Sequence, residues 1–341
     1  MAEPWLFWLE ELCSEDNDVV GKKCANLGEL IRAGLPVPSG FALSVSAYYT
    51  FLNETDAAQE IAKFFDRDGR RSRKLSEWAE VSSILRGIVE NQPMPLEMAQ
   101  AITSKYQELQ TKCGMPDPPV SVRSAGAVSR PGQYETHLNV RGADNVLRDV
   151  ISVWSSSFNP RSLAFRAQND LPIESDPIGV AVLGMIDART AGVTLTADPN
   201  TGDDTKILIE ANWGLGESVV SGAVTPDHFI LDKGTLCILE KRLGDKARCI
   251  ACTESGIIEK DVVADKYSEF CLSEDELKEI GNYGKRIEEH FKGVPQDIEW
   301  AVRGEFPKES DIFFLQTRPA IIAQKKSATD KILDLLMSQR H

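Results

Sequence analysis

Two short stretches near the end of the chain decide the fold: Pro295-Gln-Asp-Ile-Glu-Trp300 and Leu315-Gln-Thr-Arg-Pro319. In the first, apolar Ile298 and Trp300 alternate with polar neighbours, and a Gly-Glu-Phe-Pro turn separates the two stretches. Alternation of this kind predicts two antiparallel strands joined as a hairpin. On such a hairpin Glu299 and Gln316 would project side by side, with Arg318 just beyond.

The polar groups of this hairpin have a common chemistry. A carboxylate and an amide oxygen are ligands that Mg²⁺ accepts, and a guanidinium suits a bound phosphate. The hairpin therefore indicates a magnesium and polyphosphate site. A surface hairpin with ordinary polar residues explains these few positions equally well, so the choice depends on the rest of the chain.

Length and charge narrow the class of protein. With 341 residues, two domains or lobes are expected. The net charge of −14 argues against a general nucleic-acid or anionic-membrane binder. The N-terminus lacks the pattern of a signal peptide, and the longest apolar run, 178–186, is too short to span a bilayer. We expect a soluble, cytoplasmic protein that holds anions through local clusters of cations.

Cysteines and histidines give weaker signals. There are seven cysteines, and Cys249 and Cys252 have zinc or redox spacing but no second pair and no nearby histidine. Reduced, mostly structural thiols are the better interpretation. The four histidines do not lie in glycine-rich loops that would expose a nucleophile, so we expect structural roles for them: His137, His228, His290 and His341.

The periodicity along the chain predicts a helical N-terminal lobe, a sheet-rich C-terminal lobe and an amphipathic tail. The boundaries we expect are 1–177, 178–325 and 326–341. Helices are predicted within 21–32, 41–115 and 143–168, and another begins at Ser273, which has capping-box spacing to Glu276. Strands are predicted at 120–123, 178–185, 191–196, 206–211, 228–231 and 236–239.

Two clusters in the N-terminal lobe have phosphate-binding chemistry. Gly21-Lys-Lys23 lies at a helix entrance, where a lysine and the free N–H groups of the first turn can meet a phosphate. Residues 122–136 follow a strand with small residues, two arginines and hydroxyl groups, as in a loop that closes over phosphates. A solvated surface lysine and an ordinary turn-rich connection are the alternatives.

A third cluster lies in the C-terminal lobe, from Glu210 to Asp227. Glycines on either side of Glu217 allow close backbone approach, and carboxylates here could bind a ribose hydroxyl or a metal. A glycine-rich turn with solvated acids is the alternative.

Seven ordered segments together resemble the N-terminal ATP-binding region of the dikinase family, which includes phosphoenolpyruvate synthase, pyruvate phosphate dikinase and rifampicin phosphotransferase. The resemblance covers about residues 12–322 and implies an α+β, ATP-grasp-like, two-lobed fold with ATP clamped between the lobes. The segments are 20–30, Val122-Arg-Ser124, 191–202, Gly214-Leu-Gly-Glu217, Thr225-Pro-Asp227, Asp297-Ile-Glu-Trp300 and 315–319.

The resemblance implies roles for the matching residues. Lys23 and Arg123 look like the phosphate-binding lysine and arginine, and Gly132 and Thr136 like the lid residues that touch the nucleotide. Glu299 and Gln316 look like the metal and phosphate ligands, and Arg318 like the arginine that stabilises transferred charge. The expected ATP-binding set, with Arg123 and Arg318 as its catalytic members, is Lys23, Arg123, Gly132, Thr136, Glu217, Glu299, Gln316 and Arg318. ATP and Mg²⁺ are the expected cofactors.

The sequence departs from the family pattern in three ways. Leu183 replaces a family glutamine, which leaves the adenine to backbone groups, and the lid loop is short, as in pyruvate phosphate dikinase. The swivelling domain with its phosphoryl-accepting histidine does not follow Arg318. This favours the smaller, ATP-binding subunit of phenylphosphate synthase, whose histidine is on a separate subunit. The alternatives are the ATP-binding half of a phosphoenolpyruvate synthase-like or rifampicin phosphotransferase-like enzyme, or a non-catalytic nucleotide-binding scaffold.

Overall fold

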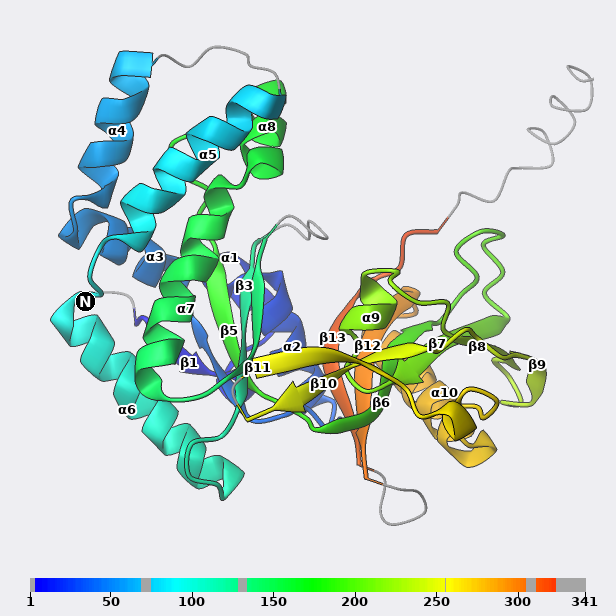
Figure 1. The fold of residues 1–341 in the computed structure, drawn as a ribbon. Coiled ribbons are helices and arrows are strands. Elements are labelled where there is room, and N and C mark those ends of the chain that lie inside the picture. Colours follow the sequence, from blue (N-terminus) through cyan, green and yellow to red (C-terminus); the bar gives the residue numbers. More distant parts are fainter. Residues whose placement is uncertain (1–3, 69–74, 128–133, 255, 305–310, 323–341) are drawn as a thin grey trace, which may run out of the picture. The chain divides into compact units, whose positions relative to one another are not determined.

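The computed structural model describes residues 4–68, 75–127, 134–254, 256–304 and 311–322. They form helices and sheets in two compact units, which confirms the α+β class and the two-lobed organisation (Figure 1). No helix in these ranges is long and apolar enough to cross a membrane. Unit 1 comprises Met1–Asp187, Ala251–Ile258 and Phe313–Gln316, and unit 2 comprises Ala188–Ile250, Glu259–Ile312 and Thr317–His341.

Unit 1 is built on a five-stranded antiparallel sheet with the order β1-β2-β5-β3-β4. The central strand β5 pairs with β2 on one side and with β3 on the other. It is apolar and completely buried, as a strand covered on both faces must be. The strands are β1 (Leu6–Trp8), β2 (Gly40–Leu43), β3 (Val120–Ala125), β4 (Thr136–Val140) and β5 (Gly179–Gly184).

One face of this sheet carries the main apolar core. Val122 and Val182 point into it, together with Trp154 and Phe158 from the helical layer. Helix α5 packs on α7 and α8 within that layer (Figure 1). The helices are α3 (Val45–Glu54), α4 (Ala57–Asp68), α5 (Leu75–Glu90), α6 (Leu96–Cys113), α7 (Ala143–Ser155), η3 (Ser156–Phe158) and α8 (Pro160–Gln168).

The opposite face is covered by the first helices of the chain. Helix α2 packs on β3 and β5 with a buried stripe that includes Leu27 and Leu30. Because side chains alternate along a strand, Arg123 points to this face while Val122 points to the core. The short elements that precede it are η1 (Leu9–Glu11), η2 (Ser14–Asp16) and α1 (Asn17–Val20), and α2 itself spans Lys22–Arg32.

Unit 2 contains a six-stranded sheet with the order β13-β12-β6-β7-β8-β9. Helix α10 (Glu274–His290) covers one face, and its Gly284 lies against Thr194 and Ile298. On this face Gly192 leaves room for the Trp300 ring, whose indole N–H donates to Thr194 Oγ1 at 2.9 Å. The strands are β6 (Ala188–Leu195), β7 (Lys206–Trp213), β8 (Asp227–Asp232), β9 (Ile238–Arg242), β12 (Gln296–Arg303) and β13 (Ile312–Pro319).

Several local predictions are confirmed. Helix α2 begins directly after Gly21, and the capping box of α10 forms through Ser273 and Glu276. The two stretches quoted first are strands β12 and β13, which are neighbours in one sheet.

Three features differ from the sequence prediction. The units divide at Asp187 rather than at residue 177, because β5 belongs to the first sheet. The first sheet holds five strands, of which β3 and β5 were predicted and β1, β2 and β4 were not. The hairpin of β10 (Arg248–Thr253) and β11 (Gly256–Asp261), followed by η4 (Ala264–Lys266), was not anticipated. The predicted tail, 326–341, lies outside the described residues.

Candidate functional site

The entrance to α2 is fixed on the end of β3. Gly21 has a φ of +82°, and a Cβ there would lie 1.9 Å from the Ala125 carbonyl oxygen. The Lys22 N–H donates to the Gly126 carbonyl at 3.0 Å. Only glycine allows this close approach. Lys23, in the first turn of α2, is therefore held close to β3, where the sequence places the candidate arginine.

Lys23 and Arg123 influence the same buried thiol. Burial raises the pKa of Cys24 to about 12, against the opposing effect of the positive charges on Lys23 and Arg123. Across the β3–β4 ladder Arg123 pairs with Thr136, which is exposed. Residues directly opposite in an antiparallel pair project from the same face. Unit 1 thus gathers two cations and a hydroxyl at one end of its sheet.

Arg123 is also anchored by strand β13. Its Nη1 donates to the Leu315 carbonyl oxygen at 3.2 Å, within the Phe313–Gln316 segment that belongs to unit 1. The Phe314 N–H fixes this segment by donating to the Pro36 carbonyl at 2.8 Å. The candidate ligand Gln316 directly follows the residue that receives Arg123.

In unit 2 the strand register places acidic residues on the face that α10 leaves uncovered. Glu299 is opposite Val193, Val193 is opposite Glu210, and Glu210 is opposite His228. Since opposed residues share a face, Glu299, Glu210 and His228 form one row across four strands. Glu210 Oε1 lies 3.4 Å from His228 Nδ1. We call this the acidic row.

Glu217 lies at the edge of the same face. It begins α9 (Glu217–Val220) and is exposed. The preceding Gly216 lies against Ala191 of β6, because a Cβ built on this glycine would be 3.6 Å from the Ala191 Cβ. Ala191 is opposite Ala301, which projects from the same side of β12 as Glu299. Asn212 holds α9 there by donating to Ser218 Oγ at 2.9 Å.

Arg318 has a carboxylate partner, Asp297, that the sequence did not predict. Its Nε and Nη2 donate to Asp297 Oδ2 at 2.8 and 2.7 Å. The neighbouring Thr317 points the other way, where its buried hydroxyl donates to Gln296 Oε1 at 2.9 Å. Arg318, bound to Asp297, therefore lies on the face of the acidic row, because Asp297 and Glu299 project from the same side of β12. Asp297 was visible in the sequence, but its partner depended on the pairing of two strands.

The donor set fits a magnesium ion. No group of three or more His, Cys, Asp or Glu side chains suited to a metal occurs among the described residues. Mg²⁺ is usually held by one or two carboxylates together with water and substrate phosphates, so the Glu299 carboxylate would be its ligand in unit 2. A bound Mg²⁺ would neutralise phosphate charge there.

Other residues singled out in the sequence have structural roles or lie outside the described ranges. Asp227 is completely buried and accepts hydrogen bonds from Lys246, Gly244 and Cys271, so it is a structural centre. Cys249 is buried and forms no disulfide. Cys252 lies three residues further along β10, so the two cysteine side chains project from opposite faces of this strand. Gly132 and His341 lie outside the described residues.

Comparisons with known proteins identify the family of this chain. The profile of the family "Pyruvate phosphate dikinase, AMP/ATP-binding domain" matches residues 17–338. Similar curated proteins include a probable phosphoenolpyruvate synthase of Methanothermobacter thermautotrophicus, 36% identical over 92% of this chain and 46% of that protein. The phosphoenolpyruvate synthase of Aeropyrum pernix is 35% identical over 96% of this chain and 43% of that protein.

The chain spans less than half the length of these two relatives. Among solved structures, D-cycloserine synthetase DcsG is only weakly similar, with a TM-score of 0.21 and 9% identity over 77% of this chain and 80% of that one, and no argument rests on it. The assignment to a family rests on the profile match and on the similarity to the two synthases. This chain belongs to the family of pyruvate phosphate dikinase AMP/ATP-binding domains, which it shares with the phosphoenolpyruvate synthases.

Proposed function

We propose that this chain binds Mg·ATP and delivers the β-phosphoryl group of ATP to a histidine on a separate subunit, which then phosphorylates phenol. The observation that carries the proposal is the common sheet face of Glu299 and Arg318 in unit 2. It supplies metal-ligand oxygens beside a guanidinium held by Asp297. Phosphoryl transfer depends mainly on positioned charge of this kind.

Unit 1 supports the same ligand chemistry. Lys23 and Arg123 concentrate positive charge in a protein of net charge −14, and Thr136 adds a hydroxyl opposite Arg123. In this proposal Lys23 and Arg123 bind phosphate oxygens, Thr136 and Gly132 touch the nucleotide, and Glu217 receives a ribose hydroxyl. Glu299 and Gln316 hold Mg²⁺, while Arg318 stabilises the transferred charge.

The proposed reaction is balanced by one water molecule. The partner's histidine nitrogen attacks the β-phosphorus, and the bond from this phosphorus to the oxygen that bridges to the α-phosphate breaks, so that AMP leaves with that oxygen. Water then attacks the γ-phosphorus, and the bond from this phosphorus to the oxygen that bridges to the β-phosphorus breaks, so that inorganic phosphate leaves and the bridging oxygen stays on the β-phosphoryl group. The products are AMP, inorganic phosphate and phosphohistidine, whose phosphoryl group passes to the phenol oxygen as the phenol proton is released.

A second candidate is the same half-reaction serving a phosphoenolpyruvate synthase-like enzyme. The names of the relatives favour pyruvate as the acceptor. A rifampicin phosphotransferase-like enzyme is a further alternative, because in each case the partner would bind the acceptor. A non-catalytic scaffold is disfavoured by the joint presence of Lys23, Arg123, Glu299, Gln316 and Arg318.

The deciding experiment follows the label of [β-³²P]ATP. The chain is incubated with Mg·ATP alone, and then with a separate protein that carries the phosphoryl-accepting histidine domain and either phenol or pyruvate. We expect acid-labile label on the partner, AMP as the nucleotide product, and label in the acceptor only when both proteins are present. Acceptor phosphorylation by this chain alone, or label on its own His137, His228 or His290, would overturn the proposal.

A further inference from the structure

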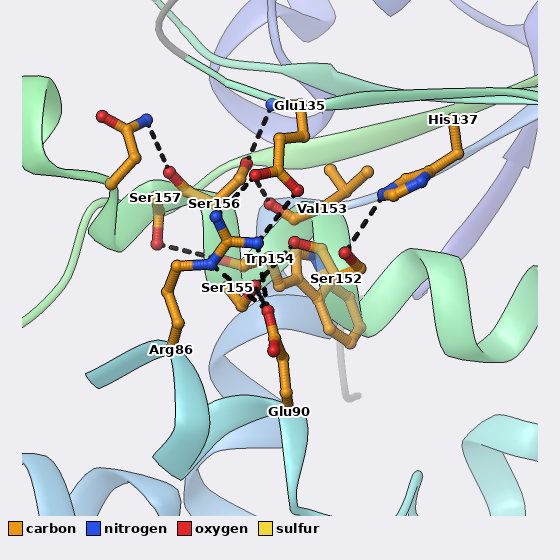
Figure 2. A network of polar contacts seen from close by, with 11 residues as sticks. Arg86, Glu90, Glu135, His137, Ser152, Val153, Trp154, Ser155, Ser156 and Ser157 are labelled. Carbon is orange, nitrogen blue, oxygen red and sulfur yellow. Dashed lines mark hydrogen bonds and ion pairs between the residues drawn. The ribbon is translucent and has the colours of Figure 1, made fainter. Parts of the chain in front are cut away.

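The residues just before Thr136 are held from the helical side of unit 1. Glu135 receives two hydrogen bonds from Arg86 of α5, Nη1 to Oε1 at 2.5 Å and Nη2 to Oε2 at 3.0 Å (Figure 2). A guanidinium that meets both oxygens of one carboxylate fixes direction as well as distance. The Glu135 N–H also donates to Ser156 Oγ at 3.2 Å.

Arg86 is itself oriented by a second carboxylate. Glu90, one turn further along α5, accepts from Arg86 Nε at 3.2 Å and from Nη2 at 3.1 Å. The same Glu90 oxygen receives the hydroxyl of Ser155 at 2.5 Å, as Figure 2 shows. The guanidinium therefore bridges α5 and the end of α7 to the start of β4, and its rotamer is fixed from both sides.

Tyr134 is tied down independently. Its hydroxyl donates to Asp176 Oδ2 at 2.5 Å, and the same oxygen accepts from the buried Arg166 at 2.8 Å and from Ser162 at 3.2 Å. Arg166 is completely buried and also donates to the Ser157 carbonyl. Two consecutive residues are thus held by two separate ionic groups.

The Arg86–Glu135 pair is not part of the buried core. Arg86 and Glu135 keep about a quarter and two fifths of their side-chain exposure, and pairs at such positions contribute little to stability. What they do fix is the backbone that enters β4, where Thr136 lies opposite Arg123. Binding groups need such a supporting layer to hold their geometry.

We infer that Arg86, acting through Glu135, is a positioning residue for nucleotide binding. It sets the place of Thr136 opposite Arg123, and Tyr134 with Asp176 sets the preceding residue. The inference rests on the proposed function as far as the ligand, Mg·ATP, is concerned. The local claim, that Arg86 orders the start of β4, does not depend on any ligand.

The test compares four proteins: the wild type, Arg86→Gln, the charge-conserving Arg86→Lys, and Arg148→Gln. Arg148 is the control, because it also forms an ion pair in unit 1, with the buried Asp149, but its own side chain is 69% exposed. Each protein is titrated with Mg·ATP by calorimetry, its melting temperature is measured, and amide exchange of β4 is followed without ligand.

We expect Arg86→Gln to weaken Mg·ATP binding roughly tenfold and to speed exchange in β4, with little change in melting temperature. Arg86→Lys should recover part of the affinity, because it keeps the charge and loses the bidentate contact, and Arg148→Gln should match the wild type. Equal affinity in Arg86→Gln and the wild type would overturn the nucleotide role, and unchanged exchange in β4 would overturn the positioning itself.

Two further results are interpretable. If the wild type does not bind Mg·ATP, the proposed function and the nucleotide role fail together, while β4 exchange still decides the local claim. If Arg86→Gln unfolds, Glu135→Gln takes its place, because it removes the carboxylate that Arg86 contacts and keeps the shape of the side chain. Affinity and β4 exchange both equal to the wild type in Glu135→Gln would then reject the inference.

Discussion

Lys246 Nζ lies 2.5 Å from Asp227 Oδ1, and neither side chain has any exposure to solvent. Asp227 also accepts the N–H groups of Gly244 and Cys271, at 2.8 and 2.9 Å. A buried charge pair is tolerated only when its remaining bonding capacity is filled in this way. The Thr225-Pro-Asp227 segment is therefore explained by the architecture of unit 2, because it joins β8 to two later parts of the chain.

Removing one member of this pair should be strongly destabilising. Lys246→Met leaves the Asp227 carboxylate buried without its counter-charge, which typically costs about 3–5 kcal/mol. Urea unfolding monitored by circular dichroism measures the loss. The matched control is Lys241→Met, which breaks the exposed ion pair with Glu274 and should change the free energy of unfolding by less than about 1 kcal/mol. Similar losses in both variants would contradict the assignment.

Glu299→Ala should weaken Mg·ATP binding by about 2–4 kcal/mol while leaving the fold intact, since it removes the only carboxylate in the proposed metal set. Calorimetry at fixed Mg²⁺ concentration measures this effect. Glu289→Ala is the control, because Glu289 is an exposed residue of α10, which covers the other face of the sheet. Unchanged affinity in a folded Glu299→Ala protein would remove Glu299 from the site.

Gly21→Ala should be much more damaging than Gly34→Ala. Both glycines have positive φ, but a Cβ at position 21 would lie 1.9 Å from the Ala125 carbonyl oxygen, while nothing lies within 4 Å at position 34. The substitution at 34 should cost about 1 kcal/mol for the backbone conformation alone. The variant at 21 must also separate α2 from β3. Equal thermal stabilities would show that the close approach is absent in solution.

Cys24 should make stability fall at alkaline pH. Burial raises its pKa to about 12 from 9.0, so the unfolded chain loses this proton first as the pH rises. Its contribution is complete below pH 9 and decreases above it, at about 1.4 kcal/mol per pH unit, until the folded protein also ionises. Urea unfolding from pH 8 to 10.5 should show a smaller alkaline slope in Cys24→Ala. At pH 8 a thiol reagent should label the exposed Cys237 and not Cys24.

Local patterns in the sequence predicted local structure well. Alternation around Ile298 and Trp300 identified β12, and the glycine before Lys22 identified the start of α2, because both signals depend on neighbouring residues. The acidic character of Glu299 and the cations at 23 and 123 were also visible in advance. Their roles in nucleotide binding stay predictions.

Pairings between distant segments were not predictable in the same way. The apolar run of β5 indicated a buried strand, but nothing in it specified β2 and β3 as its partners. For the same reason Asp297 was not recognised as the partner of Arg318, nor Glu135 as the partner of Arg86. In each case the alternation or helical spacing of one segment does not identify the distant segment with which it pairs.

The central position of β5 has a consequence for synthesis on the ribosome. The β1–β2 pair and the β3–β4 pair are separate until residues 179–184 emerge, because β5 is the strand that joins them. Nascent chains ending before β5 would expose two unpaired strand edges, and pairing across so long a separation is intrinsically slow. Arrested chains that end after β5 should therefore resist protease much better than chains that end before it. We expect the sheet of unit 1 to form during synthesis only once β5 has emerged.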